Sequence, residues 1–232
     1  DKMLKEVAEK RLSAIREFTE LGSGYRIAMR DLEIRGAGNL LGERQSGHME
    51  AVGYDLYCKM LNQAVMEAKG EKIQEDFETS VDIDIDAFIP STYIKNEFQK
   101  LDMYKRIASI QNADEYGEML DELIDRFGEL PKPAANLLLV ALIRAEAHAA
   151  GVVQLVHKEK ETRIYMHERA DVDVAAIPDF LAEYGRRIQF KATAKNPYFL
   201  VNMNGFKGQG LLLEEKSLVE NMLRILCHKE LN

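Results

Sequence analysis

The stretch Asp31–Gly47, DLEIRGAGNLLGERQSG, concentrates glycine, arginine and a polar amide in a segment that suits neither a plain helix nor a plain strand. Seven of the 15 glycines of the chain fall within 32 positions around it, from Gly22 to Gly53. Glycine suits positions where the backbone takes a positive φ or approaches another group closely. The stretch is therefore predicted to be a shaped functional loop and not a flexible linker.

Helices are predicted on both sides of this loop. Apolar residues recur every three or four positions over 2–21, where a helix would end at Gly22. Residues 25–35 predict a second helix that returns along the first after a tight turn, with a strand over 25–30 as the alternative. Residues 50–69 predict a further helix. We therefore expect a helical hairpin with a glycine-rich loop over residues 1–75.

Residues 71–78 are polar and predict a boundary between this hairpin and a second domain over 76–232. The strict alternation of Val81–Asp86 then predicts an edge strand. Its aspartates, Asp82, Asp84 and Asp86, raise a metal site as an alternative. A strand would place them in line about 7 Å apart without a turn glycine, so a solvated strand face is the favoured interpretation.

The second domain is predicted to be α+β and helix-rich, with a small sheet. Asp114 suits a helix N-cap, and Pro131 or Pro133 suits a first helical turn. The predicted helices are 92–110, 114–127, 131–150, 174–184 and 213–229, and the predicted strands after the first are 152–157, 163–167, 187–193 and 198–203.

Charge is distributed unevenly along the 232 residues. Residues 71–232 hold 20 basic and 28 acidic side chains, which accounts for the whole net charge of −8. Such an acidic region is a poor autonomous binder of nucleic acid, so any DNA contact is expected from the first third. No apolar run approaches the ~18 residues of a membrane span. Two isolated cysteines, Cys58 and Cys227, fit a reducing compartment, so we expect a cytoplasmic protein without a membrane partner.

The sequence lacks the common catalytic motifs. No Gly-Lys-Ser/Thr follows a glycine loop, no Gly-x-Ser-x-Gly elbow occurs, and the five histidines are scattered. We expect no catalytic residue, no metal site and no cofactor in this chain, which is then no enzyme on its own. It begins at Asp1 without an initiator methionine, so we expect it to be part of a longer protein.

Two groups of segments carry a resemblance to known families. RLSAI at Arg11–Ile15, LGSGYRIA at Leu21–Ala28 and the loop Asp31–Gly47 closely resemble the translocation motif shared by RecG-type branch-migration helicases and transcription-repair coupling factors. RecG-type enzymes end soon after this motif. The continuation, with Phe88–Ile94, Tyr104–Ala108 and Glu122–Gly128, resembles the C-terminal domain of the bacterial coupling factors.

The resemblance implies a mechanical role. The coupling factors are double-stranded DNA translocases of helicase superfamily 2 in which two RecA-like motor lobes bind ATP and Mg²⁺ and push on stalled RNA polymerase. A domain near their N-terminus recruits nucleotide excision repair through the protein UvrA. The hairpin would lie on the second motor lobe and couple ATP hydrolysis to movement on duplex DNA. The C-terminal domain would pack on the N-terminal repair-recruiting domain and keep it masked.

The resemblance also assigns residues. Arg11 and Arg35 match the arginines that hold the hairpin together, and Gln45 matches the loop glutamine that faces the motor and the DNA. An arginine presents a rigid fork of donors that lysine cannot reproduce, which suits such a brace. The loop backbone would depend on four glycines, Gly36, Gly38, Gly42 and Gly47. The alternative hypothesis is a free-standing protein-interaction module that uses the loop for docking.

Overall fold

The computed structural model describes residues 77–231, which fall into two compact units. The sheet unit consists of Phe77–Asp86 and the chain from Ile110 onward, and Ala87–Ser109 belongs to the other unit. Each unit is described by itself. The helices and the glycine-rich loop predicted within residues 1–75 lie outside the described residues, and the predicted domain boundary stays a prediction.

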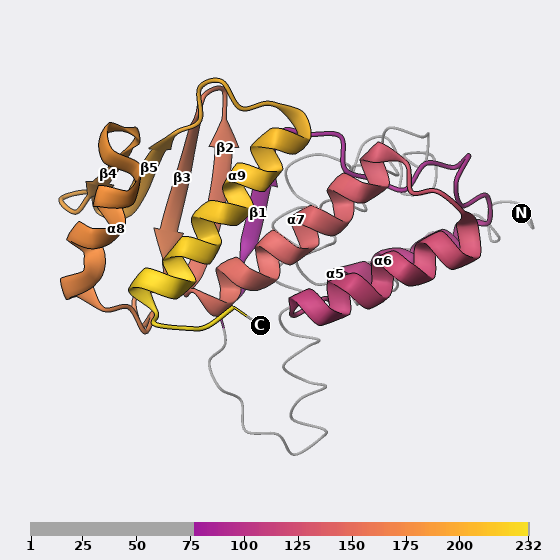
Figure 1. Ribbon diagram of the computed structural model, residues 1–232, viewed down its shortest axis with the longest axis horizontal. Coiled ribbons are helices and arrows are strands. Elements are labelled where there is room, and N and C mark those ends of the chain that lie inside the picture. Colours follow the sequence, from indigo (N-terminus) through magenta and orange to yellow (C-terminus); the bar gives the residue numbers. More distant parts are fainter. Residues whose placement is uncertain (1–76, 232) are drawn as a thin grey trace, which may run out of the picture. The chain divides into compact units, whose positions relative to one another are not determined.

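A five-stranded sheet with the order β1-β2-β3-β5-β4 forms the centre of the sheet unit (Figure 1). Its strands are β1 Ser80–Ile83, β2 Val152–Lys158, β3 Glu161–Met166, β4 Ile188–Lys191 and β5 Tyr198–Asn202. β1 pairs with β2 in parallel, and all other pairs are antiparallel. The predicted position of the first strand at a sheet edge is confirmed, and so is the helix-rich α+β class.

β1 is shorter than the alternating sequence predicted. The backbone N–H of Ile85 donates to the carbonyl oxygen of Ile83 at 2.9 Å, a local turn that ends the strand. Asp82 lies in β1, whereas Asp84 and Asp86 follow it. The expectation of three aspartates in line on one strand is therefore wrong, because a turn bond replaces the ladder beyond Ile83.

The helices of the sheet unit lie close to their predicted ranges. They are α6 Ala113–Phe127, α7 Lys132–Ala149, α8 Ile177–Tyr184 and α9 Gly208–Asn221, with the short turns η2 Val174–Ala176 and η3 Gly185–Arg187 and the π-helical turn η4 Met222–Leu226. Asn112 and not Asp114 caps α6, because its side-chain oxygen accepts from the N–H of Glu115 at 2.9 Å. Pro133 lies in the first turn of α7 as predicted. α9 begins earlier than the predicted residue 213.

The other unit contributes α5 Glu97–Ala108 to the described residues. Its predicted start at residue 92 is too early, because the side-chain oxygen of Asn96 accepts from the N–H groups of Phe98 and Gln99, each at 3.0 Å, and so caps the helix there. The hydroxyl of Tyr104 accepts from the N–H of Ile89 at 2.8 Å and fixes the preceding segment on the helix.

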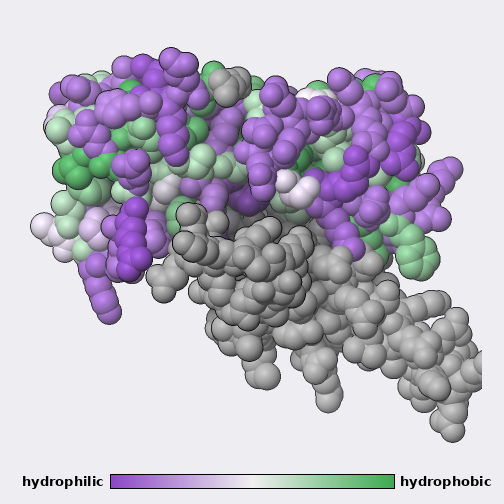
Figure 2. Space-filling view, turned by 90° about the horizontal axis from the view of Figure 1, so that it is seen from below, coloured by the Kyte–Doolittle hydropathy of each residue, from purple (hydrophilic) through white to green (hydrophobic). Residues whose placement is uncertain are grey.

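The two faces of the sheet differ in what lies on them. α7, α8 and α9 pack on one face, here called the covered face, which carries Ile83, Leu155, Ile164, Phe199 and Val201 (Figure 1). None of these five is more than 7% exposed. Because side chains alternate along a strand, Arg163, Tyr165, Tyr198 and Leu200 point the other way and form the open face. On the view in Figure 2, most of the coloured surface is hydrophilic.

Candidate functional site

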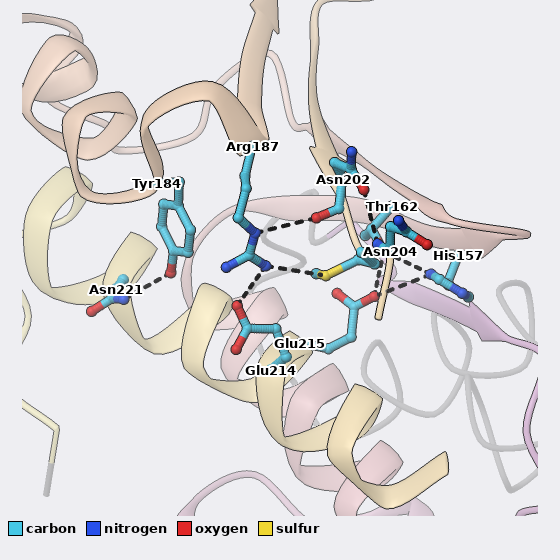
Figure 3. Close-up of polar contacts among 10 residues, drawn as sticks. His157, Thr162, Tyr184, Arg187, Asn202, Asn204, Glu214, Glu215 and Asn221 are labelled. Carbon is cyan, nitrogen blue, oxygen red and sulfur yellow. Dashed lines mark hydrogen bonds and ion pairs between the residues drawn. The ribbon is translucent and has the colours of Figure 1, made fainter. Parts of the chain in front are cut away.

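Buried polar side chains gather where α9 crosses the covered face (Figure 3). In α9, Leu211 and Leu218 are buried, and Glu215 lies on the same helical face between them. The side chain of Glu215 is fully buried. A carboxyl group in such a place requires hydrogen bonds from its neighbours, because its desolvation is otherwise costly.

Glu215 finds its partner on the central strand β3. The hydroxyl of Thr162, itself fully buried, donates to Oε1 of Glu215. Nδ1 of His157, from β2, lies 3.1 Å from the Thr162 hydroxyl oxygen and 3.7 Å from Oε1 of Glu215. Because the hydroxyl hydrogen is directed at Glu215, Nδ1 of His157 acts as the donor to Thr162. These three residues form the Thr162 network.

Both titratable groups of the Thr162 network are held in their uncharged forms. Burial raises the pKa of Glu215 to about 8, with a further increase from Glu214 and an opposing hydrogen bond from Thr162. Burial lowers the pKa of His157 and outweighs the hydrogen bond with the backbone of Glu159 and the charge of Asp84. At neutral pH the contact between His157 and Glu215 is therefore a neutral hydrogen-bonded cluster and not an ion pair.

The neighbouring residue Glu214 has the opposite environment. Its Oε1 pairs with Nη2 of Arg187 at 2.7 Å, and both side chains are partly exposed. The Arg187 guanidinium also lies 4.9 Å from the ring centroid of Phe206, and its Nε donates to the carbonyl oxygen of Asn202 at 3.4 Å. Arg187 thus fastens α9 to the end of β5 from outside the core (Figure 3).

A second polar group lies between α9 and α7. Burial raises the pKa of Glu146 in α7 to about 7, opposed by the charge of Lys216 and supported by that of Glu220. Lys216 and Glu220 form an ion pair one turn apart on α9. Burial also raises the pKa of the Tyr116 hydroxyl in α6, and the charge of Lys216 opposes that increase. The pKa values of two buried carboxyl groups, Glu215 on α9 and Glu146 on α7, are thus raised to near neutral pH.

The arrangement suits stabilisation of the fold and not catalysis. The Thr162 hydroxyl is closed to solvent and donates to an uncharged acid, so no base activates it as a nucleophile. Within residues 77–231, no group of three or more His, Cys, Asp or Glu residues could hold a metal ion. In the same range, no helix is long and apolar enough to cross a membrane.

The residues to which the sequence assigned roles are not part of the Thr162 network or of the group around Glu146. Arg11, Arg35 and Gln45 lie outside the described residues. The same holds for the loop glycines, Gly36, Gly38, Gly42 and Gly47, and for Cys58. Cys227 is a free, partly buried thiol.

Sequence reasoning missed the Thr162 network. The signal that could have found it is the spacing of Glu215, four residues after Leu211 and three before Leu218, which puts an acid on the apolar face of the helix.

Comparisons with known proteins identify relatives of the chain. Residues 83–177 match the family model described as the TRCF domain. The transcription-repair-coupling factor of Bacillus subtilis (strain 168) is 49% identical over 192 residues, which cover 81% of this chain and 16% of that protein. The protein of the same name from Staphylococcus aureus (strain USA300) is 45% identical over 176 residues, 75% of this chain and 15% of that protein.

A solved structure agrees with the fold of the described residues. The crystal structure of the C-terminal domain of a transcription-repair coupling factor matches with a TM-score of 0.61 at 24% identity, and covers 68% of this chain and 100% of that chain. At this identity the likeness supports the fold. The family relationship rests on the two relatives identified by sequence, and the chain spans only about a sixth of their length.

Proposed function

The chain belongs to the transcription-repair-coupling factor family, and we propose that it is the non-catalytic C-terminal part of a bacterial DNA translocase that removes stalled RNA polymerase and recruits nucleotide excision repair. The observation that carries this proposal is the 49% identity over 192 residues to the coupling factor of Bacillus subtilis. Because the chain spans 16% of that protein, ATP and Mg²⁺ would be bound by motor lobes elsewhere in the parent protein.

Residues 1–75 would couple ATP hydrolysis to movement on duplex DNA. Arg11 and Arg35 would brace the hairpin, since each guanidinium offers a rigid fork of hydrogen-bond donors. Gln45 would face the motor and the DNA from the glycine-rich loop. The support for these roles is the match of the sequence to the translocation motif.

The sheet unit would mask the N-terminal repair-recruiting domain and so restrain the binding of UvrA. The outward side of α6 supports this proposal, because it presents Asp114, Asp121 and Asp125 to solvent. Ile124, 44% exposed, lies among them. An apolar side chain within an acidic surface suits a basic partner surface with an apolar centre.

The coupling role is tested in the parent protein with Arg35→Ala. Loss of the hairpin brace should leave ATP hydrolysis intact and abolish the displacement of a third strand from duplex DNA, because hydrolysis would no longer move the motor along the duplex. Arg126→Ala, which removes an exposed arginine of α6, is the control and should keep both activities. If Arg35→Ala also keeps both, the loop is a docking or packing element and the coupling role is wrong.

The masking role is tested by reversing charge on α6. Asp121→Lys combined with Asp125→Lys in the parent protein should raise its affinity for UvrA by about fivefold or more, the range of typical coupling free energies. Asp179→Lys combined with Glu183→Lys makes the same charge change on exposed residues of α8 and should leave that affinity unchanged. Equal effects of the two pairs would mean that net charge, and not a masking surface, controls UvrA binding.

A further inference from the structure

The open face of the sheet is left uncovered by the helices of the sheet unit. Arg163 is exposed there, and Tyr165, Tyr198 and Leu200 are half-buried. Charges of both signs lie on this face. Asp82 lies on the edge strand β1 and Lys158 on β2, Glu161 and Arg163 lie on β3, and Lys191 lies on β4. The half of the open face formed by β3, β5 and β4 thus carries two cations and one carboxylate, a net charge of +1 in a chain that is acidic overall.

Aromatic rings and cations lie close together within this half of the open face. The ring centroids of Tyr165 and Tyr198, which are cross-strand partners, are 5.1 Å apart, with an angle of 37° between the ring planes. The guanidinium carbon of Arg163 lies 5.6 Å from the Tyr198 ring centroid. Strand pairing extends the row to Gln154 beside Tyr165 and to Lys191 beside Tyr198. One row thus crosses four strands with an amide, two rings and an ammonium group.

This combination matches what single-stranded nucleic acid requires of a protein surface. Bases stack on aromatic side chains and on guanidinium planes, and nearby cations neutralise the phosphates. An extended acidic peptide would pair with Arg163 and Lys191 but would offer nothing that stacks on the two tyrosines. The rings therefore favour nucleotides over acidic side chains as the occupant of this face.

We propose that the open face binds a short segment of single-stranded nucleic acid, with bases stacked on Tyr165 and Tyr198 and phosphates beside Arg163 and Lys191. This binding goes beyond the proposed coupling and masking roles and does not depend on them. Two rings accommodate few bases, and the net charge of −8 opposes long-range attraction. The binding is therefore weak and short-ranged, and it falls with added salt.

The test uses the whole 232-residue chain and fluorescently labelled oligo-dT and oligo-U of about 12 nucleotides. Fluorescence anisotropy at about 50 mM and about 200 mM salt should give saturable binding that weakens at the higher concentration. Tyr165→Leu and Tyr198→Leu keep an apolar side chain in place, and each should weaken binding about fivefold or more because a stacking platform is lost.

Arg163→Ala has a closely matched control in Arg126→Ala. Both arginines are exposed and lie over an aromatic ring, since the guanidinium of Arg126 is 5.0 Å from the ring centroid of Phe127 on α6. Arg163→Ala should weaken binding and reduce the slope of log affinity against log salt concentration by about 1, the value for one phosphate contact. Arg126→Ala should change neither the affinity nor the slope. Because Arg163 is exposed, this comparison remains decisive even if a tyrosine variant fails to fold, which circular dichroism would reveal.

Three results would overturn the proposal. The first is the absence of saturable oligonucleotide binding at the lower salt concentration. The second is an equal loss of affinity in Arg163→Ala and Arg126→Ala. The third is binding of a labelled polyglutamate peptide as tight as that of the oligonucleotides and insensitive to both tyrosine substitutions, which would assign the face to acidic protein segments.

Discussion

The covered and open faces of the same five-stranded sheet differ in how they accommodate polar side chains, which are buried on one face and exposed on the other. Thr162 and Arg163 are adjacent in β3, yet Thr162 is fully buried beside Glu215 and Arg163 is exposed beside Tyr198. The buried polar side chains at the covered face are uncharged and share hydrogen bonds, whereas Arg163 on the open face is exposed to solvent. Alternation along one strand thus separates a stabilising surface from a surface available for binding.

Adjacent glutamates in α9 show the same contrast within a helix. Glu214 stays at the rim and pairs with Arg187, whereas Glu215 points into the core and has its pKa raised to about 8 by burial. Its second oxygen has no hydrogen-bond partner among the described residues. The difference lies in the loss of solvation and not in the residue type, because the two side chains are chemically identical.

The largest difference between the faces should appear when a large apolar side chain is removed. Phe180 of α8 is fully buried on the covered face, with its ring centroid 5.4 Å from that of Phe199. Phe180→Ala should lower the free energy of unfolding by about 3–5 kcal/mol, because it leaves a cavity. Leu200→Ala on the half-buried open face should cost about 1 kcal/mol. Chemical denaturation measures both, and equal costs would mean that the open face is also packed.

Much of this organisation could be predicted from the sequence, but not which face is covered. The alternation in β3 and the apolar α7 located both elements, because their patterns have the periods of a strand and a helix. Alternation separates Thr162 from Arg163 but does not reveal on which side α9 packs. The parallel pairing of β1 with β2 could not be predicted either, because it joins segments about 70 residues apart in the sequence. The acidic pair Glu214-Glu215 does not by itself show which glutamate is buried, because that depends on the position of α9 over the sheet.

The second prediction concerns the pH dependence of stability. Because burial raises the pKa of Glu215 from 4.5 to about 8, the folded protein holds this proton more tightly than the unfolded chain. The resulting stabilisation is complete below about pH 4.5 and is lost as the pH rises towards 8. From about pH 7 to about pH 8 the free energy of unfolding should fall by about 1 kcal/mol, and Glu215→Gln should remove this decrease.

Glu214→Gln is the control for this experiment, since it changes the same residue type one position away. It should keep the decrease between pH 7 and pH 8, as measured by denaturation at each pH. Glu146, whose pKa is raised to about 7, lowers the free energy of unfolding mainly below pH 7. The interval from pH 7 to pH 8 therefore reports chiefly on Glu215. A Glu215→Gln variant with an unaltered slope would show that this acid is charged in the folded protein.

A smaller effect is expected at the rim of the covered face. Arg187→Lys keeps the positive charge near Glu214 but loses the Nε contact with Asn202 and the planar stacking on Phe206. We expect a loss of about 0.5–1 kcal/mol in the free energy of unfolding, because the pair is partly exposed and screened by solvent. Full retention of stability in the lysine variant would reduce the role of Arg187 to its charge alone.

The division of roles between the two faces is tested most directly by Thr162→Val and Arg163→Ala measured side by side for stability and for oligonucleotide binding. Thr162→Val leaves Glu215 and His157 without their shared partner and should cost about 1–3 kcal/mol while the affinity stays unchanged. Arg163→Ala should change stability by no more than about 0.5 kcal/mol and should weaken binding. Equal losses of stability, or an unchanged affinity in Arg163→Ala, would contradict the account.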